Sequence, residues 1–394
     1  MKRTISKEST AEATLRRVGA CLGAALLALA CMPASAGGDW GRDGDRDGAY
    51  EQTNLVADLP DVALLQDTNL VNAWGISFSA TSPFWISDNG SGLATLYAVT
   101  YDTNGTVQVA KQGLQVGIPG DGTPTGQLFN STTGFHTNVF IFASEDGTIS
   151  GWRGALGTTA ETLVARATAV YKGITLITTA GGPMLLAANF REGTLDAYDT
   201  NLTLVAQYAD TKAPMGYAPF NVQLLGGIVF VTFAKQDAVK HDDVAGAGHG
   251  LIDVFNPATG KFHRFATGSK AGGSLREINS PWGLAISPTT FGKHADQLLV
   301  GNFGSGTIMA FDADGRFDGL LENRHEWPIV IDGLWGLAFG NGGKAGRPST
   351  LYFTAGPNGE NNGLFGALDP APEHKRGRDH DHDGDGDPGA HGYH

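Results

Sequence analysis

Oxygen-bearing side chains recur in this chain at the polar turns that border short apolar runs. They are Asp88 with Asn89, Glu145, Asn189, Asn302 and Asp332. Ca²⁺ binds six to eight oxygen ligands, so carboxylates and amides that converged on one point would suit a calcium ion. The same residue types are also what tight turns need for their own hydrogen bonds. A bound calcium ion and a set of purely structural turns therefore both remain open.

A long polar stretch, Lys235–Gly250, joins two apolar runs that comparable parts of the chain join through "REG" or "GSG". Its first half, "KQDAVKHDD", is dense in charge, and its second half, "VAGAGHG", is small and flexible. Loops much longer than their siblings usually carry function or are mobile. The candidate ligand-binding residues in it are Lys235, Asp237, His241, Asp242 and Asp243. The alternative is a solvated flap that only covers its own strands.

Signals for covalent catalysis are missing. The chain holds no G-x-S-x-G, no H-E-x-x-H and no glycine-rich phosphate loop after a strand, and both cysteines lie before residue 36. Three more polar residues beside apolar runs are candidate ligand contacts: His136, Asn72 and Asn279. A single histidine can equally serve as a structural hydrogen-bonding group.

Six segments share one form, in which an apolar run, a polar turn and a second apolar run follow one another. They are Phe84–Tyr97, Phe140–Trp152, Leu185–Tyr198, Val229–Phe255, Leu298–Phe311 and Leu351–Leu368. Their spacing of about 45 to 70 residues leaves room for four strands in each copy. A four-stranded unit repeated six times closes into a ring without exposed sheet edges. The sequence therefore predicts an all-β, six-bladed β-propeller.

A Trp-Gly pair precedes three of these segments, at Trp74, Trp282 and Trp335, and "YAPFNVQLL" fills that place in the fourth. We expect the pair to begin the innermost strand of each blade, with Trp packed between blades and Gly allowing close approach. The last segment provides only three strands, and Gln52–Leu59 is an unassigned strand, so we expect an N-terminal strand to close the ring. In a propeller the loops that enter the innermost strands and the second-to-third connections share one face, where the candidate residues should meet.

The two ends of the chain differ from the repeats. Basic residues, the apolar run Val18–Met32 and "ASA" at 34–36 predict a secretory signal peptide, cleaved near Ala36. We expect residues 37–51 to be a disordered acidic, Gly-rich segment, 52–369 the propeller, and 370–394 a disordered Asp/His/Gly-rich tail. Both outer segments contain D-x-D-x-D-G, half of a calcium loop, but lack the acid that completes it. The two outer segments can therefore be interpreted as solvated tails or as weak metal sites.

The net charge bears on the kind of partner. The formal net charge is −13, and the five Lys/Arg and two Glu of residues 1–36 contribute +3 to it, which leaves −16 after cleavage. That charge disfavours nucleic acid and anionic membranes. We expect an exported monomer, periplasmic or extracellular, with no membrane span after cleavage and a small molecule, a glycan or a protein as partner.

Several segments resemble one protein family over roughly Asn54–Leu368. "NLVNAWGISFSATSPFWISDNGSGLATLY", "GYAPFNVQLLGG" and "LYFTAGPNGENNGLFG" look like those of exported bacterial proteins without an established activity, some of which end in a Pro-Glu-Pro sorting segment. This chain has the Asp/His tail in that place. More distantly, the repeat resembles NHL-type propellers, which include binding scaffolds and calcium- or zinc-dependent lactonases of the gluconolactonase type. That likeness concerns the fold.

Two functions remain open. The first is a binding module whose polar loops on one face hold a ligand, with a calcium ion among them. The second is a metal-dependent hydrolase of lactonase or esterase type, in which a metal polarises a carbonyl and a His or Asp acts as base. The sequence shows no acid/base pair, which favours the binding module.

Overall fold

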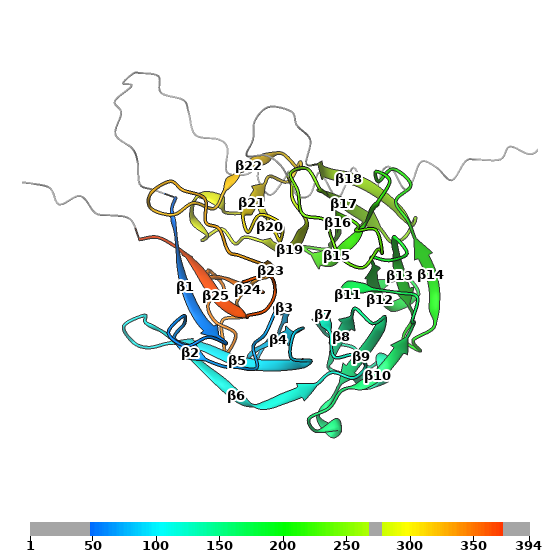
Figure 1. Ribbon diagram of the computed structural model, residues 1–394, viewed down its shortest axis with the longest axis horizontal. Coiled ribbons are helices and arrows are strands. Elements are labelled where there is room, and N and C mark those ends of the chain that lie inside the picture. Colours follow the sequence, from blue (N-terminus) through cyan, green and yellow to red (C-terminus); the bar gives the residue numbers. More distant parts are fainter. Residues whose placement is uncertain (1–47, 268–277, 373–394) are drawn as a thin grey trace, which may run out of the picture.

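The computed structural model describes residues 48–267 and 278–372, and these form a ring of six blades (Figure 1). In five blades four antiparallel strands follow one another in chain order, and the sixth blade has a five-stranded sheet that includes two strands from the N-terminal end of the ring. Blade one holds β3 (Ala73–Ser77), β4 (Phe84–Asp88), β5 (Leu93–Tyr101) and β6 (Val107–Gly117), and blade two holds β7 (Pro124–Phe129), β8 (Phe140–Ser144), β9 (Thr148–Trp152) and β10 (Glu161–Ala165). The predicted six-bladed propeller is confirmed.

The remaining blades repeat this order. Blade three holds β11 (Tyr171–Thr179), β12 (Gly182–Asn189), β13 (Thr194–Tyr198) and β14 (Leu204–Tyr208), and blade four holds β15 (Tyr217–Leu225), β16 (Ile228–Lys235), β17 (Gly250–Asn256) and β18 (Lys261–Thr267). Blade five holds β19 (Pro281–Ile286), β20 (Leu298–Asn302), β21 (Ile308–Phe311) and β22 (Phe317–Leu320), and blade six holds β23 (Leu334–Phe339), β24 (Leu351–Ala355) and β25 (Leu364–Pro370). Three short 3₁₀ turns, η1 (Phe135–Thr137), η2 (Gly154–Leu156) and η3 (Gly292–His294), complete the described elements.

Burial explains why the repeats read as continuous apolar runs. Every residue of the second strands β4, β8, β20 and β24 is buried, because both faces of these strands pack against neighbouring blades. The outermost strand β14 alternates between half-buried and exposed residues, as expected for a strand with one face in water. The fully buried second strands therefore account for apolar runs that recur in the sequence.

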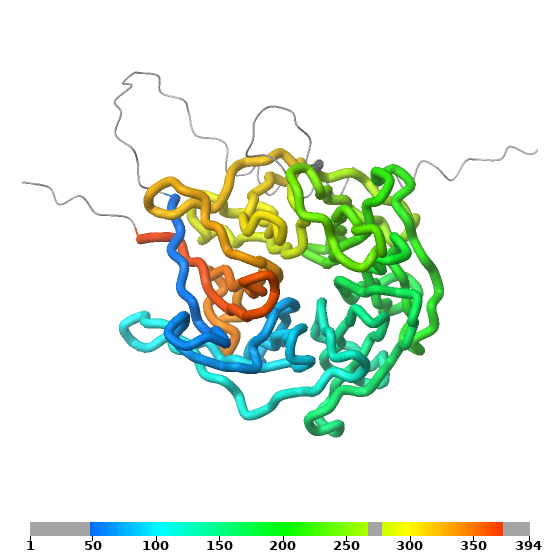
Figure 2. The backbone as a smooth tube through the Cα atoms, in the orientation of Figure 1, coloured from blue at the N-terminus to red at the C-terminus, as the bar shows by residue number. Residues whose placement is uncertain are grey.

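The ring closes through the N-terminal strand. β1 (Tyr50–Ala57) pairs antiparallel with β25 from Tyr50–Pro370 to Ala57–Leu364, and the short β2 (Leu65–Gln66) pairs with the end of β1. Figure 2 shows this first segment of the propeller beside the last one. The predicted closing strand is confirmed, and the blades run from Tyr50 to Pro370 where the sequence predicted 52–369.

Five of the six innermost strands carry a glycine as their third residue, and these glycines set how closely the blades approach. A Cβ on Gly75 would lie 2.3 Å from the carbonyl oxygen of Thr125, and one on Gly283 would lie 2.3 Å from that of Trp335. Real Cβ atoms do not come so near, so only glycine fits at these positions. The predicted position of the Trp-Gly pair at the start of the innermost strand is confirmed, as is the close approach at its glycine. The indoles of Trp74, Trp282 and Trp335 pack against one another in one buried cluster and are not wedged separately between blades.

The structure corrects the expected place of His136. The innermost strand of blade two is β7, and His136 lies in η1, between β7 and β8, on the face opposite the loops that enter the innermost strands. Thr125-Gly126 stands where three other blades have Trp-Gly, so the sequence motif did not reveal this strand. His136 Nδ1 lies 3.8 Å from Glu161 Oε1. Glu161 is the first residue of β10, which follows the third strand of the same blade.

Residues 1–47 and 373–394 lie outside the described residues. They include the predicted signal peptide, the predicted C-terminal tail after residue 372, and both D-x-D-x-D-G stretches except Gly48. Across residues 48–267 and 278–372, the helices are too short and too polar to span a membrane.

Candidate functional site

The centre of the ring is filled by aromatic side chains. Trp74 stacks on Trp335 with ring centroids 3.6 Å apart, and Phe303 stacks on the other side of Trp335 at 3.9 Å. Trp282 meets both indoles edge-on. Together with Phe190 and Phe220 they form one buried cluster, which we call the aromatic plug.

We call the face that carries the loops before the innermost strands the entry face. A series of hydrogen bonds runs along the aromatic plug on this face. Trp335 Nε1 donates to Asn72 Oδ1 (2.9 Å), and Asn72 Nδ2 donates to Glu360 Oε2 (2.7 Å) and Asn89 Oδ1 (3.2 Å). Asn89 Nδ2 then donates to Glu145 Oε2 (2.9 Å). These contacts join blades six, one and two.

Lys172 continues the chain of contacts into blade three. Its side chain is only 2% exposed, and its ammonium lies 5.2 Å from the ring centroid of Trp74. The ammonium donates to Glu145 Oε1 and, over 3.2 Å, to Asp242 Oδ1. Burial alone would lower the pKa of Lys172, but the two carboxylates outweigh it and raise that pKa. Lys172 is therefore a buried cation.

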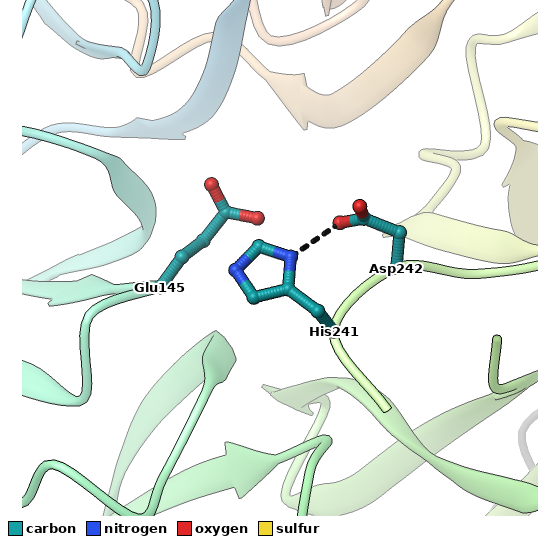
Figure 3. A group of neighbouring side chains, drawn as sticks. All are labelled: Glu145, His241 and Asp242. Carbon is teal, nitrogen blue, oxygen red and sulfur yellow. Dashed lines mark hydrogen bonds and ion pairs between the residues drawn. The ribbon is translucent and has the colours of Figure 1, made fainter. Parts of the chain in front are cut away.

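The long connection of blade four reaches over this cation. It runs from Gln236 to His249 and begins as a hairpin, with Gln236 bridged to Asp243 and Val244 N–H donating to the Lys235 carbonyl. We call Asp237–Asp242, between the bridged pair, the insert tip. Within it, His241 Nδ1 lies 2.8 Å from Asp242 Oδ1, and the His241 ring lies between Glu145 and Asp242 (Figure 3).

The second half of the same connection is anchored to its surroundings. Gly246 N–H donates to Asn279 Oδ1 (2.7 Å), at the entry to blade five, and Tyr217 O–H donates to the Gly248 carbonyl (3.1 Å). Burial raises the pKa of Asp243 at the base of the tip. Loops of all six blades are thus linked on the entry face.

A cavity of about 410 Å³ opens beside this network. It is lined by Asp121, Thr123, Glu145, Asp146, Ala167, Ala169, Arg191 and His241. Blades two, three and four all contribute, and three carboxylates face one guanidinium. A second cavity of about 340 Å³ lies at the other end of the innermost strands, where its lining holds no charged side chain. The charged cavity is therefore the candidate for specific chemistry.

The two carboxyl groups at the ends of the network have pKa values that move in opposite directions. Burial raises the pKa of Glu360 above its ordinary value, and the hydrogen bond from Asn72 lowers it only in part. Burial also acts to raise the pKa of Asp242, but Lys172 and His241 together hold that pKa below its ordinary value. The two carboxyl groups of one network therefore differ in their affinity for a proton, a difference that could not be seen in the sequence.

Of the six predicted calcium ligands, hydrogen bonds join only Asn89 to Glu145. Asp88 is fully buried in blade one, and Asn189 bonds to Glu192 and Asp196 of its own blade. Asn302 Oδ1 accepts from Asn279 N–H, and Asp332 accepts from Asn358 N–H, again within single blades. The described hydrogen bonds do not link the other four residues to this pair or to one another.

Among the predicted ligand-binding residues, Asn72, His241 and Asp242 belong to the network described above. Asp237 Oδ1 accepts from His241 N–H and so shapes the tip, and Lys235 and Asp243 lie at its base. Asn279 contacts the second half of the connection, through Gly246. His136 is on the opposite face.

Sequence reasoning left Lys172, Glu360 and Arg191 out of the candidate set. A signal for Lys172 was present, because Lys172-Gly173 occupies the second and third positions of β11, where other blades have Trp-Gly.

Comparisons with known proteins find distant relatives in sequence. No protein-family model matches the chain. "Uncharacterized protein R648" of Acanthamoeba polyphaga mimivirus is 28% identical over 339 residues, 80% of this chain and 78% of the relative. "Uncharacterized protein L690" of the same virus is 27% identical over 339 residues, 80% of this chain and 84% of the relative. The resemblance to exported bacterial proteins rests on the sequence motifs alone.

Two solved structures are similar in fold. A streptogramin B lyase structure has a TM-score of 0.46 at 13% identity and covers 84% of this chain and 100% of its own. The soluble aldose sugar dehydrogenase from Escherichia coli has a TM-score of 0.48 at 11% identity and covers 82% and 100%. At these values the likenesses carry no argument about activity.

Proposed function

We propose that this propeller is a binding module for a small polar molecule that carries a positive charge, held in the cavity beside Glu145. One observation carries the proposal: loops from three blades converge on a cavity of about 410 Å³, and the insert tip places His241 in its wall. Three carboxylates against one guanidinium favour an amine over an anion. Volumes of this order are typical of small-molecule sites.

The test removes the insert tip and keeps the anchored second half of the connection. In this variant Asn-Gly replaces Asp237–Asp242 between the bridged residues Gln236 and Asp243, because Asn-Gly suits a two-residue hairpin turn. Replacing the whole connection would also break the contacts of Gly246 and Gly248 with neighbouring loops. We expect the variant to fold, because Lys172 keeps Glu145 as partner.

Spermidine, glucosamine, glucose and acetate are suitable probes, each added in the presence of a chelator while thermal unfolding is followed. The amines should raise the melting temperature of the wild-type protein, since a ligand that binds only the folded state stabilises it. The tip variant should lose that rise. The proposal fails if no amine stabilises the wild type, or if the tip variant responds like the wild type.

A hydrolase of lactonase or esterase type is the second candidate, and one observation favours it. His241 Nδ1 lies 2.8 Å from Asp242 Oδ1, which is the arrangement of an oriented general base. Turnover of p-nitrophenyl acetate or of a γ-lactone, lost in His241→Ala, would support this function over simple binding.

We further propose that the chain is exported and acts as a monomer. The signal-peptide pattern of residues 1–36 and the resemblance to exported bacterial proteins support export. Calcium at the six turn residues stays a proposal, which elemental analysis of the purified protein would test.

A further inference from the structure

We propose that Glu145, His241 and Asp242 form a binding site for a divalent transition-metal ion on the entry face. One potential ligand atom of each residue lies within 4.8 Å of those of the other two. Figure 3 shows the imidazole between the two carboxylates, with Glu145 projecting from one loop and the other two residues from the insert tip. This ligand set shares only Glu145 with the calcium ligands expected from the sequence.

The histidine decides which metal fits. Imidazole suits Zn²⁺, Co²⁺, Ni²⁺ or Fe²⁺, whereas Ca²⁺ prefers sites built from oxygen alone. Ligand atoms at zinc distances lie roughly 3.5 Å from one another, so the three groups must draw closer on binding. The tip can provide this movement, because the Asp242 side chain is 65% exposed and that of His241 is 36% exposed. Glu145, at 12% exposed, is the fixed ligand.

Hydrogen bonds already orient the carboxylates. Asn89 Nδ2 donates to one oxygen of Glu145, and the Lys172 ammonium donates to the other oxygen and to Asp242 Oδ1. Donors in this outer position fix the direction of metal-binding oxygens. The same ammonium repels a second cation, so Lys172 limits how tightly the site binds metal while it holds the two carboxylates close together.

Three protein ligands leave coordination positions for other molecules, as in catalytic zinc sites. Glu145 and His241 also line the cavity of about 410 Å³, so a bound molecule could reach the metal. The inference therefore rests on the same site as the proposed function. The two have separate tests, because amine binding is measured with a chelator present and metal binding without any ligand.

The test follows thermal unfolding of the full chain with ZnCl₂ or CoCl₂ and with a chelator. The wild-type melting temperature should rise by about 4 °C when the metal exceeds its Kd roughly a hundredfold. His241→Ala and Glu145→Gln should lose the rise. His136→Ala should keep it, since His136 is an exposed histidine on the opposite face. Metal held only by the five histidines after Glu373 should change the melting temperature little, because those residues follow the last strand of the propeller.

Two results would overturn the metal site: no stabilisation of the wild type by either metal, or the same stabilisation in His241→Ala as in the wild type. Amine binding without metal stabilisation would reject the metal site alone. Metal stabilisation without amine binding would reject the proposed ligand and leave the metal site in place.

Discussion

Lys172 occupies the position that tryptophan has in three other blades, and its ammonium joins blade three to the loops of blades two and four. An ammonium that is 2% exposed needs compensation, because burying an unpaired charge costs several kcal/mol. Glu145 provides most of it, at 12% exposed, and the indole face of Trp74 adds to it. Asp242 contributes less, since its side chain is largely in water.

Replacing Lys172 by Met tests this account at the level of one residue. The substitution keeps the volume but leaves Glu145 with a buried charge, so we expect a loss of about 3 kcal/mol in the free energy of unfolding. The double variant E145Q/K172M should regain part of that loss, because glutamine carries no charge. Urea denaturation of the wild type, both single variants and the double variant measures the coupling. A coupling below about 0.5 kcal/mol would show that the ion pair does not stabilise the fold.

The elements that position these side chains are the six innermost strands, which approach one another through their glycines. A Cβ on Gly173 would lie 2.1 Å from Asn221 Oδ1 and 2.8 Å from Asn221 Cα, so β11 and β15 would have to separate. Since Lys172 precedes Gly173 directly, the same contact fixes where the ammonium enters the network.

Gly173→Ala should therefore destabilise the protein by about 1–3 kcal/mol, the usual cost of overpacking a close contact. Gly113 in β6 is the matched control, because a Cβ there meets no atom within 4 Å. Gly113→Ala should change the unfolding free energy by less than about 0.5 kcal/mol. Equal midpoints of chemical denaturation for the two variants would contradict the close-contact explanation.

The insert tip is another element that positions these side chains. It is an extension of the β16–β17 hairpin, and its length alone allows residues of blade four to reach Lys172 of blade three and the neighbourhood of Glu145 in blade two. A three-residue turn such as those of other blades could not cross that distance. The length of the connection thus predicted that it extends, while the fold decided which residues it meets.

The whole molecule depends on ring closure. Tyr50, Leu55, Val56 and Ala57 of β1 are buried, and Tyr50 O–H donates to the Phe291 carbonyl (2.9 Å) of blade five. Without β1, blade six would expose the edge of β25, and unpaired edges promote association between molecules.

We expect a variant lacking residues 37–60 to lose at least about 4 kcal/mol of stability and to aggregate, because each large buried side chain of β1 contributes roughly 1.5–3 kcal/mol. A variant lacking residues 37–48 keeps all of β1 and should unfold like the protein that retains them. Light scattering and thermal unfolding of both variants measure the difference. Equal melting temperatures would be evidence against closure by this strand.

Much of this architecture was readable from the sequence. The repeated strand pairs, the Trp-Gly pairs and the N-terminal strand that closes the ring all follow from local patterns. Strand periodicity and turn residues act over only a few residues. The place of His136 did not follow, because blade two has Thr125-Gly126 where the recognisable motif would stand.

The candidate site was decided by the tertiary structure. The sequence by itself determined a six-bladed ring and marked Asn72, Glu145, His241 and Asp242 as polar residues near one face. Only the fold placed Lys172 between the carboxylates of Glu145 and Asp242, which are 97 residues apart in the chain. The pKa of Glu360 and that of Asp242 differ because burial and neighbouring charges, not residue type, control proton binding. Such long-range neighbours arise from ring closure, and no local pattern encodes them.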